Sequence, residues 1–406
     1  MKLRLYLGMI ALLFALQTGA AELSDQGAAE LDSYLQEAIA TTHIPGLVAL
    51  VVNKDGIIYE KAFGLMDSAN NKPMTTDAIF QLFSMTKPVT STAVMMLVEE
   101  GKIKLDDPAS EYLPALANAR VMTSWNAADG TYSAAPAKNV MTVRHLLTHT
   151  SGLGYSFTSE ILNKLTNGDF NARATAYPLL FEPGTRWLYG ESTRVLGEMV
   201  QAVSGQELFD FMKARILDPL HMVDTTYDVP AEKNMRVITS HQYNGTAMTE
   251  TPNPAGIISF AHLGDAGLHG TARDYAQFIR LFLNGGSVND SGRLLKRETV
   301  ALMGQNHTAP VKVELMHSAN KTISEDFPLG AGVDSFGLGF QRAESQVPGM
   351  RSVGSLSWAG AANTEFWIDP QKEIGAVLLM QFTPFYDATA IAVLQGFEQR
   401  IYQSLK

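Results

Sequence analysis

Ser84-Met85-Thr86-Lys87 places a hydroxyl that can act as a nucleophile three residues before an amine. If residues 88–98 form a helix, Ser84 and Lys87 share one face at its positive end. Pro88 fits there, because the first helical N–H groups have no intrahelical partner. A partly desolvated lysine could be neutral and take the serine proton. The alternative is a helix cap followed by a solvated lysine, so other segments must decide.

The composition is that of an ordinary globular protein, with 406 residues, 46% hydrophobic and 18% charged. The formal net charge of −10 argues against a nucleic acid or an anionic membrane as partner, since both require a basic surface. The chain contains no cysteine, which excludes disulfides, thiol catalysis and thiolate metal sites.

Residues 1–21 resemble a secretory signal peptide. Lys2 and Arg4 precede an apolar run over residues 5–16, and small residues follow up to Ala21. The run is short for a membrane span, although an uncleaved anchor is the alternative. Cleavage after Ala21 would remove two basic residues and give a net charge of −12. We therefore expect a periplasmic or secreted protein without a membrane partner after cleavage.

Strand patterns lie at both ends of the chain, and helical patterns lie between them. The sequence predicts strands at 46–52, 57–63, 336–340, 363–368 and 374–382, with a turn at 54–56, and helices at 22–41, 88–98, 143–148, 191–204, 271–283 and 386–405. We predict an α+β fold with an antiparallel sheet built from both chain ends, flanked by helices, and an inserted, mostly helical region. Residues 22–406 would form one unit, with an α/β part at about 22–87 and 330–406 and a helical part at about 88–329.

Other catalytic motifs are absent from the sequence. No serine has glycine at both −2 and +2, as a nucleophile elbow requires. The glycine-rich stretch 264–270 lacks the spacing of a nucleotide-binding loop. His145 and His149 could share a metal, but no glutamate follows His145, and buried hydrogen-bonding histidines are the alternative. His269 lies in the glycine-rich stretch and is either close to the site or structural.

Two further segments could complete a site around Ser84. A Pro183-Gly184 turn precedes Tyr189, whose phenol could exchange a proton with serine or a leaving group; the alternative is a half-buried aromatic residue. Small residues within 357–362 precede a predicted strand and would let a substrate carbonyl approach backbone N–H groups. Close packing of sheet against helix is the alternative there.

Taken together, these segments resemble the serine β-lactamase and penicillin-binding-protein superfamily, on its class C side, and most resemble the family VIII carboxylesterases. The resemblance covers about residues 25–400. The segments that carry it occur in one order: Ser84-x-x-Lys87, Leu146-Leu147-Thr148-His149-Thr150-Ser151-Gly152-Leu153, Pro183-Gly184 leading to Tyr189, Trp358-Ala359-Gly360, and Trp367-Ile368-Asp369-Pro370.

The resemblance implies a role for each matching residue. Ser84 would be the acylated nucleophile, with Lys87 and Tyr189 handling its proton; which of the two is the base stays open. The backbone N–H groups of Ser84 and Ala361 would form the oxyanion hole. Trp358, Ala359 and Gly360 would bind substrate where lactamases carry Lys-Thr-Gly.

Two departures from the lactamase pattern bear on the substrate. Trp358 replaces the lysine that would receive a substrate carboxylate, and Glu191 stands where lactamases have asparagine. Losing a charged hydrogen bond costs on the order of 1.5–3 kcal/mol. A neutral ester with an apolar acyl group therefore fits better, with Glu191 as a substrate-binding residue or paired with Arg194 on the helix surface.

These inferences predict a secreted serine esterase that hydrolyses short to medium acyl esters through an acyl-enzyme on Ser84. We expect a small-molecule ester as the partner and no metal, cofactor, nucleic acid or required protein partner. The alternatives are a β-lactamase, D-peptidase or acyltransferase that uses the same site, or a non-catalytic wall-binding protein that keeps the fold.

Overall fold

The computed structural model describes residues 20–169, 171–251, 262–288, 292–328 and 330–406. The expected signal peptide lies outside these residues except for Ala20 and Ala21. Among the described helices, none combines the length and apolar character that a membrane crossing requires.

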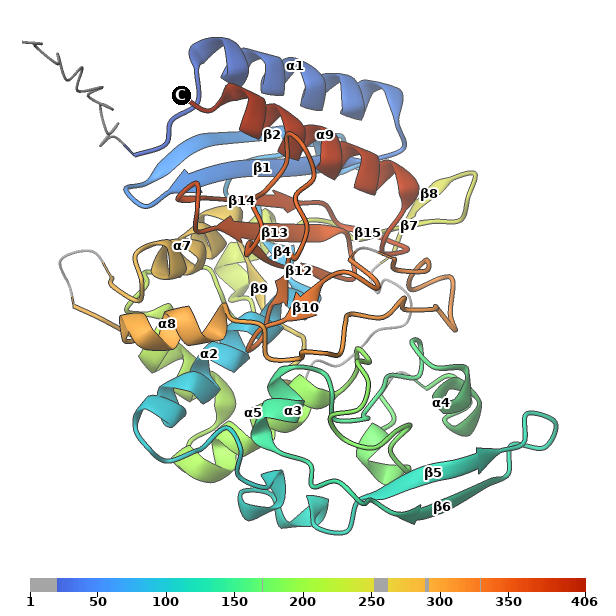
Figure 1. The fold of residues 1–406 in the computed structure, drawn as a ribbon. Coiled ribbons are helices and arrows are strands. Elements are labelled where there is room, and N and C mark those ends of the chain that lie inside the picture. Colours follow the sequence, from blue (N-terminus) through green and yellow to red (C-terminus); the bar gives the residue numbers. More distant parts are fainter. Residues whose placement is uncertain (1–19, 170, 252–261, 289–291, 329) are drawn as a thin grey trace, which may run out of the picture.

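An eight-stranded antiparallel sheet joins the two ends of the chain (Figure 1). Its central pair aligns Val48 with Leu379, so an early strand lies directly beside a late one. The predicted antiparallel sheet from both termini is therefore confirmed. In spatial order the strands are β10 (Ser335–Phe336), β11 (Gln341–Arg342), β12 (Leu356–Gly360), β13 (Thr364–Asp369), β14 (Ile374–Leu379), β1 (Gly46–Asn53), β2 (Ile57–Asp67) and β3 (Lys72–Pro73).

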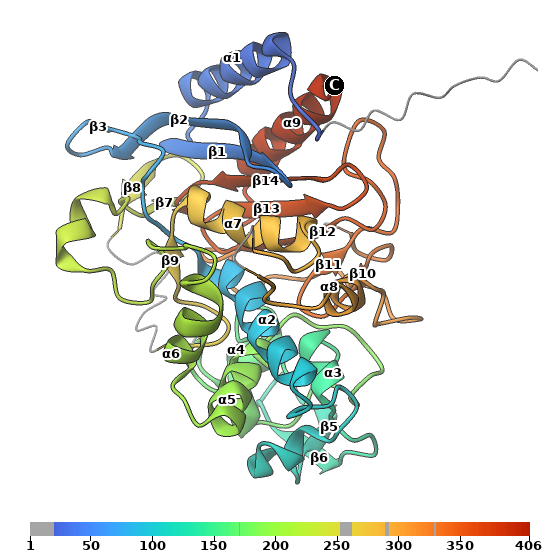
Figure 2. The ribbon, with the colours of Figure 1, turned by 90° about the vertical axis from the view of Figure 1, so that its left-hand side faces the viewer.

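Helices cover both faces of this sheet (Figure 2). The terminal helices α1 (Asp25–Thr41) and α9 (Ala388–Ser404) lie on one face, and α7 (Ala272–Leu283) lies on the other. Every residue of β1 is buried, because alternate side chains of a strand point into opposite layers. This explains the uninterrupted apolar run at 46–52. Although α7 falls within the segment predicted as the helical part, it packs on the sheet.

The segment between β3 and β10 holds most of the other helices. Its centre is α2 (Thr86–Glu99), in which every residue from Thr86 to Leu97 is buried, as expected for a helix that is apolar on all sides. The helices around it include α3 (Val143–Leu147), α4 (Glu160–Leu165), α5 (Ser192–Ser204), α6 (Leu208–Met212) and α8 (Arg297–Met303).

This segment also contains strands that the sequence did not predict. These are the pair β4 (Phe80–Gln81) and β9 (His269–Gly270), the hairpin β5 (Arg120–Trp125) and β6 (Tyr132–Pro136), and the strands β7 (His241–Tyr243) and β8 (Met248–Glu250). The strand β15 (Phe382–Thr383), from the C-terminal part of the chain, pairs with β7.

The prediction of one strand over residues 336–340 was wrong. The chain reverses there between β10 and β11, and Gly339 has a φ of 98°. A Cβ on Gly339 would lie 2.4 Å from that of Ser91, so only glycine lets the turn lie against α2. The strand predicted to reach Phe382 also ends at Leu379, and Phe382 begins β15.

Candidate active site

Ser84 lies in a 3₁₀ turn, Phe83–Met85, that leads directly into α2. Phe83 has a φ of 46°, which is unusual for a bulky residue and marks a constrained approach to the serine. Lys87 follows within the first turn of α2, and its Nζ lies 3.0 Å from Ser84 Oγ. The spacing of the tetrapeptide therefore produces the contact predicted from helix geometry.

Lys87 is buried beneath the serine. Its Nζ donates a hydrogen bond to the backbone carbonyl of Asp265 at 2.8 Å and lies 4.7 Å from the ring centre of Tyr189. Burial lowers the pKa of Lys87 to about 7, and Arg194 acts in the same direction, whereas Asp265 opposes it. The amine is thus poised between its charged and neutral forms near neutral pH.

Tyr189 reaches the serine from just before α5. Its hydroxyl donates a hydrogen bond to Ser84 Oγ at 2.5 Å. Burial raises the pKa of Tyr189, although its hydrogen bond to Ser84 acts in the opposite direction, so the group is a phenol at neutral pH. The next residue must be glycine, because a Cβ on Gly190 would lie 2.1 Å from the carbonyl oxygen of Leu153. Ser84, Lys87 and Tyr189 are therefore brought together as predicted.

A buried network of charges supports Lys87. Arg194 Nε lies 3.1 Å from one Asp265 oxygen, and the Tyr155 hydroxyl donates to the other. Burial acts to raise the pKa of Asp265, but Arg194 and Lys87 outweigh it and hold that pKa below its usual value. Asp265 is thus a paired carboxylate whose backbone carbonyl orients the lysine.

Glu191 belongs to this network and not to the substrate cavity. Its carboxylate lies 2.8 Å from Arg194 Nη1 and accepts a hydrogen bond from the Ala174 N–H at 2.7 Å. The predicted substrate-binding role of Glu191 is therefore incorrect. The alternative, a pair with Arg194, describes the structure, except that the pair is buried and not on the helix surface, with side-chain exposures of 1% and 4%.

An apolar cavity of about 390 Å³, including its mouth, opens at Ser84. Tyr189 and Ala361 also line it, so the residues of the predicted oxyanion hole lie on one cavity. None of the described lining residues carries a charge. Its apolar wall is made by Phe157, Met316, Ile323, Phe327, Trp358 and Phe385.

The strand β12 forms one side of this cavity. It pairs with β13 along its length, but β11 pairs only with its first two residues, which leaves the stretch from Trp358 to Gly360 beside the cavity. A Cβ on Gly360 would lie 2.4 Å from the Leu82 carbonyl oxygen, so glycine brings β12 against the turn that carries Ser84. The segment from Trp358 to Ala361 thus lies where the sequence predicted.

The histidines considered as ligands have other surroundings. His145 Nδ1 accepts a hydrogen bond from the Thr142 N–H at 3.2 Å and caps α3. His149 is stacked near Trp358, with 6.2 Å between ring centres, and burial lowers its pKa well below the usual value. His269 lies in β9 and is not among the residues that line the cavity. The described residues contain no group of three potential metal ligands.

Sequence reasoning missed Asp265 and Tyr155 as parts of the site. Asp265 lies 178 residues from Lys87, and it contacts the lysine through its backbone. The only signal was its place in the glycine-rich stretch 264–270, where glycine permits close packing: a Cβ on Gly264 would lie 2.5 Å from the Thr193 carbonyl oxygen.

Several known proteins are similar to this chain. A family model described as Beta-lactamase matches residues 31–395. Protein Rv1367c of Mycobacterium tuberculosis is 30% identical over 371 residues, which cover 87% of this chain and 90% of the relative. Lovastatin esterase of Penicillium rubens is 29% identical over 396 residues, which cover 92% of this chain and 98% of the relative.

The structure of Simvastatin Synthase (LovD) from Aspergillus terreus shares the fold, with a TM-score of 0.79 at 22% identity, over 93% of this chain and 98% of that one. The family match and the hydrogen-bonded serine, lysine and tyrosine indicate serine hydrolase or acyltransferase activity, and an esterase is among the relatives. The chain belongs to the beta-lactamase family.

Proposed function

We propose that this protein is a secreted serine esterase that hydrolyses short to medium acyl esters through an acyl-enzyme on Ser84. The observation that supports this most is the position of Ser84, which is hydrogen-bonded to Lys87 and Tyr189 and lines an apolar cavity whose described lining is uncharged. Secretion is inferred from residues 1–21 alone. An acyltransferase, in which an alcohol replaces water in the second step, is the second candidate, because an acyl-enzyme serves both reactions.

In the proposed reaction, Ser84 Oγ attacks the ester carbonyl and its proton passes to neutral Lys87. The N–H groups of Ser84 and Ala361 would hold the oxyanion of the tetrahedral intermediate. Tyr189, which burial keeps protonated, would donate a proton to the leaving alcohol oxygen as the ester bond breaks. The proton on Lys87 then restores the phenol. Water attacks the acyl-enzyme by the same steps in reverse and releases the acid.

The character of Trp358 favours an uncharged ester over a β-lactam or peptide carboxylate. Trp358 lies on the cavity wall and is only 6% exposed. Its ring centre is 5.0 Å from that of Tyr189 and 5.4 Å from that of Phe336. A substrate carboxylate placed against this wall would lose its hydration without gaining a cationic partner. Ester substrates avoid that cost.

Three substrates compared side by side test the proposal. We expect kcat/KM for p-nitrophenyl butyrate to exceed that for nitrocefin by about tenfold to a hundredfold, because losing a charged hydrogen bond costs on the order of 1.5–3 kcal/mol. A D-Ala-D-Ala peptide should be left intact. Nitrocefin turnover faster than ester turnover would replace the esterase proposal with a β-lactamase.

Activity should depend on the ionisation of Lys87. Its pKa is lowered to about 7, and only the neutral amine can accept the serine proton. We expect kcat/KM to fall about tenfold per pH unit at acidic pH and to level off at alkaline pH, with the midpoint near the lysine pKa. Initial rates on p-nitrophenyl butyrate, followed at an isosbestic wavelength, measure this profile. A midpoint near the ordinary lysine value would show that burial does not tune this amine.

The far wall of the cavity should limit acyl chain length. Phe327 and Met316 pair through their backbones, with hydrogen bonds of 2.8 and 3.2 Å, and Phe385 packs on Phe327 with 5.3 Å between ring centres. Phe327→Ala should remove this wall and raise kcat/KM for p-nitrophenyl octanoate relative to the butyrate by about tenfold. A tenfold change is at the lower end of the discrimination that a hydrophobic pocket achieves between substrates of different size. Leu315→Ala, at an exposed position outside the cavity, is the control. An unchanged chain-length profile in Phe327→Ala would place the acyl chain elsewhere.

A further inference from the structure

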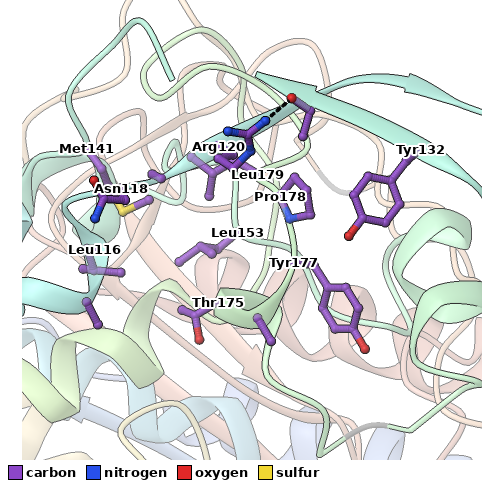
Figure 3. Close-up of a pocket in the computed structure, with 14 residues that line it drawn as sticks. Leu116, Asn118, Arg120, Tyr132, Met141, Leu153, Thr175, Tyr177, Pro178 and Leu179 are labelled. Atoms are coloured by element: carbon purple, nitrogen blue, oxygen red, sulfur yellow. Dashed lines mark hydrogen bonds between the residues drawn. The ribbon is translucent and has the colours of Figure 1, made fainter. Parts of the chain in front are cut away.

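A second cleft lies between the β5–β6 hairpin and residues 174–179 (Figure 3). It has a volume of about 750 Å³ including its open mouth. We call it the hairpin cleft. None of Ser84, Lys87 and Tyr189 lines it, so it is separate from the proposed ester site.

The floor of the hairpin cleft is apolar and rigid. Met141, Leu153 and Leu179 are buried there, with at most 5% exposure. The Leu179 N–H donates to the Arg120 carbonyl at 2.7 Å, and the Met122 N–H donates to the Leu179 carbonyl at 2.9 Å. The segment around Leu179 is thus attached to β5 like an additional strand. Backbone hydrogen bonds therefore fix the floor of the cleft in place.

The rim of the hairpin cleft is polar and carries one positive charge. The Arg120 guanidinium donates to the Ala134 carbonyl across the hairpin, and Figure 3 shows it above the floor. Tyr132 and Tyr177 lie together at one end of the cleft (Figure 3). None of the described lining residues is acidic.

Arg120 differs from most arginines of this acidic protein because its guanidinium has no described carboxylate as a partner. It forms no ion pair with any described residue. By contrast, a described carboxylate lies within 4 Å of each of Arg144, Arg173, Arg186, Arg194, Arg215, Arg236, Arg273, Arg342 and Arg351. A guanidinium fixed by one backbone carbonyl keeps further N–H donors for a planar anion.

We propose that the hairpin cleft binds a small organic carboxylate with an aromatic or short alkyl body. The carboxylate would pair with Arg120, and the apolar body would lie on Leu153 and Leu179 beside the two tyrosine rings. An inorganic anion would leave the apolar floor unused, and a neutral compound would leave Arg120 without a partner. The proposal does not depend on the esterase assignment.

Titration calorimetry with 3-phenylpropionate tests this site in protein whose Ser84 has been phosphonylated by an alkyl fluorophosphonate. If the serine does not label, Ser84→Ala protein serves instead. We expect one saturable site, at least tenfold weaker binding of 3-phenylpropan-1-ol, and no detectable binding of inorganic phosphate at the same concentrations. These three results together require both the charge and the apolar floor.

Two arginine variants locate the binding. Arg120→Ala should weaken 3-phenylpropionate binding at least tenfold while leaving ester hydrolysis unchanged, because Arg120 is exposed and does not line the cavity at Ser84. Arg297→Ala, which removes an exposed arginine outside the cleft, should bind as wild type does. Equal binding by Arg120→Ala and wild type, or equal binding of the alcohol and the carboxylate, would overturn the proposal.

Discussion

Ser84→Ala is expected to lower kcat/KM for p-nitrophenyl butyrate by about a thousandfold or more, because no acyl-enzyme can form without the nucleophile. Lys87→Met should cause a loss of about a hundredfold to ten-thousandfold, since the chain then lacks an acceptor for the serine proton at 3.0 Å. The two losses should not add in the double variant, because each residue acts only through the other.

A fluorophosphonate probe reports the reactivity of the serine directly. We expect it to label wild type at one position, to leave Ser84→Ala unlabelled, and to label Lys87→Met slowly. Ser324→Ala is a matched control, since Ser324 lines the same cavity while its hydroxyl donates to the Glu325 carbonyl at 2.7 Å. It should keep esterase activity within a few-fold of wild type. Activity near the wild-type level in either Ser84→Ala or Lys87→Met would contradict the serine mechanism.

The local parts of the site could be predicted from the sequence because helix geometry determines them. Three residues of separation at the start of a helix place Ser84 and Lys87 on one face, where their side chains can meet. The strands at both termini were also predictable, since β1 is apolar from Gly46 to Val52 and needs cover on both faces. Their pairing across more than 300 residues was predicted from the order of the patterns, with strands at both ends of the chain and helices between them.

The parts that the sequence missed depend on long-range packing. The Asp265 carbonyl contacts Lys87 as a backbone group, so its side-chain type carries no signal for that contact. Glu191 was misassigned because a carboxylate beside a catalytic tyrosine can point either into the cavity or into the protein. Its burial with Arg194 depends on Asp265, which lies 71 residues further along the chain from Arg194. Residues 336–340 look like a strand because they are apolar, but a turn pressed against α2 needs the same character.

Arg194→Met is expected to destabilise the protein by about 3–5 kcal/mol, because it removes the cation between two buried carboxylates. Arg194 Nη1 lies 2.8 Å from Glu191 and its Nε 3.1 Å from Asp265, and all three side chains are at most 4% exposed. Methionine keeps most of the apolar volume of the arginine side chain, so the loss of stability measures the effect of removing the charge. Urea unfolding measures the difference, and Arg186→Ala, which breaks an exposed pair with Glu314, should cost at most about 1 kcal/mol.

The pH dependence of this variant distinguishes lost charge from lost packing. Burial already raises the pKa of Glu191 against the opposing effect of Arg194, and Arg194 helps to hold the pKa of Asp265 below its usual value. Removing Arg194 should therefore raise the native-state pKa of both carboxyl groups. The native state of the variant then binds more protons at mildly acidic pH than that of wild type, so the stability difference between Arg194→Met and wild type should shrink as the pH falls from about 8 to about 5. A packing defect would lower the free energy of unfolding by the same amount at both pH values. If the difference from wild type does not shrink at the lower pH, the two carboxylates are not left charged and unpaired, and the buried network does not hold Asp265 beneath Lys87 by charge.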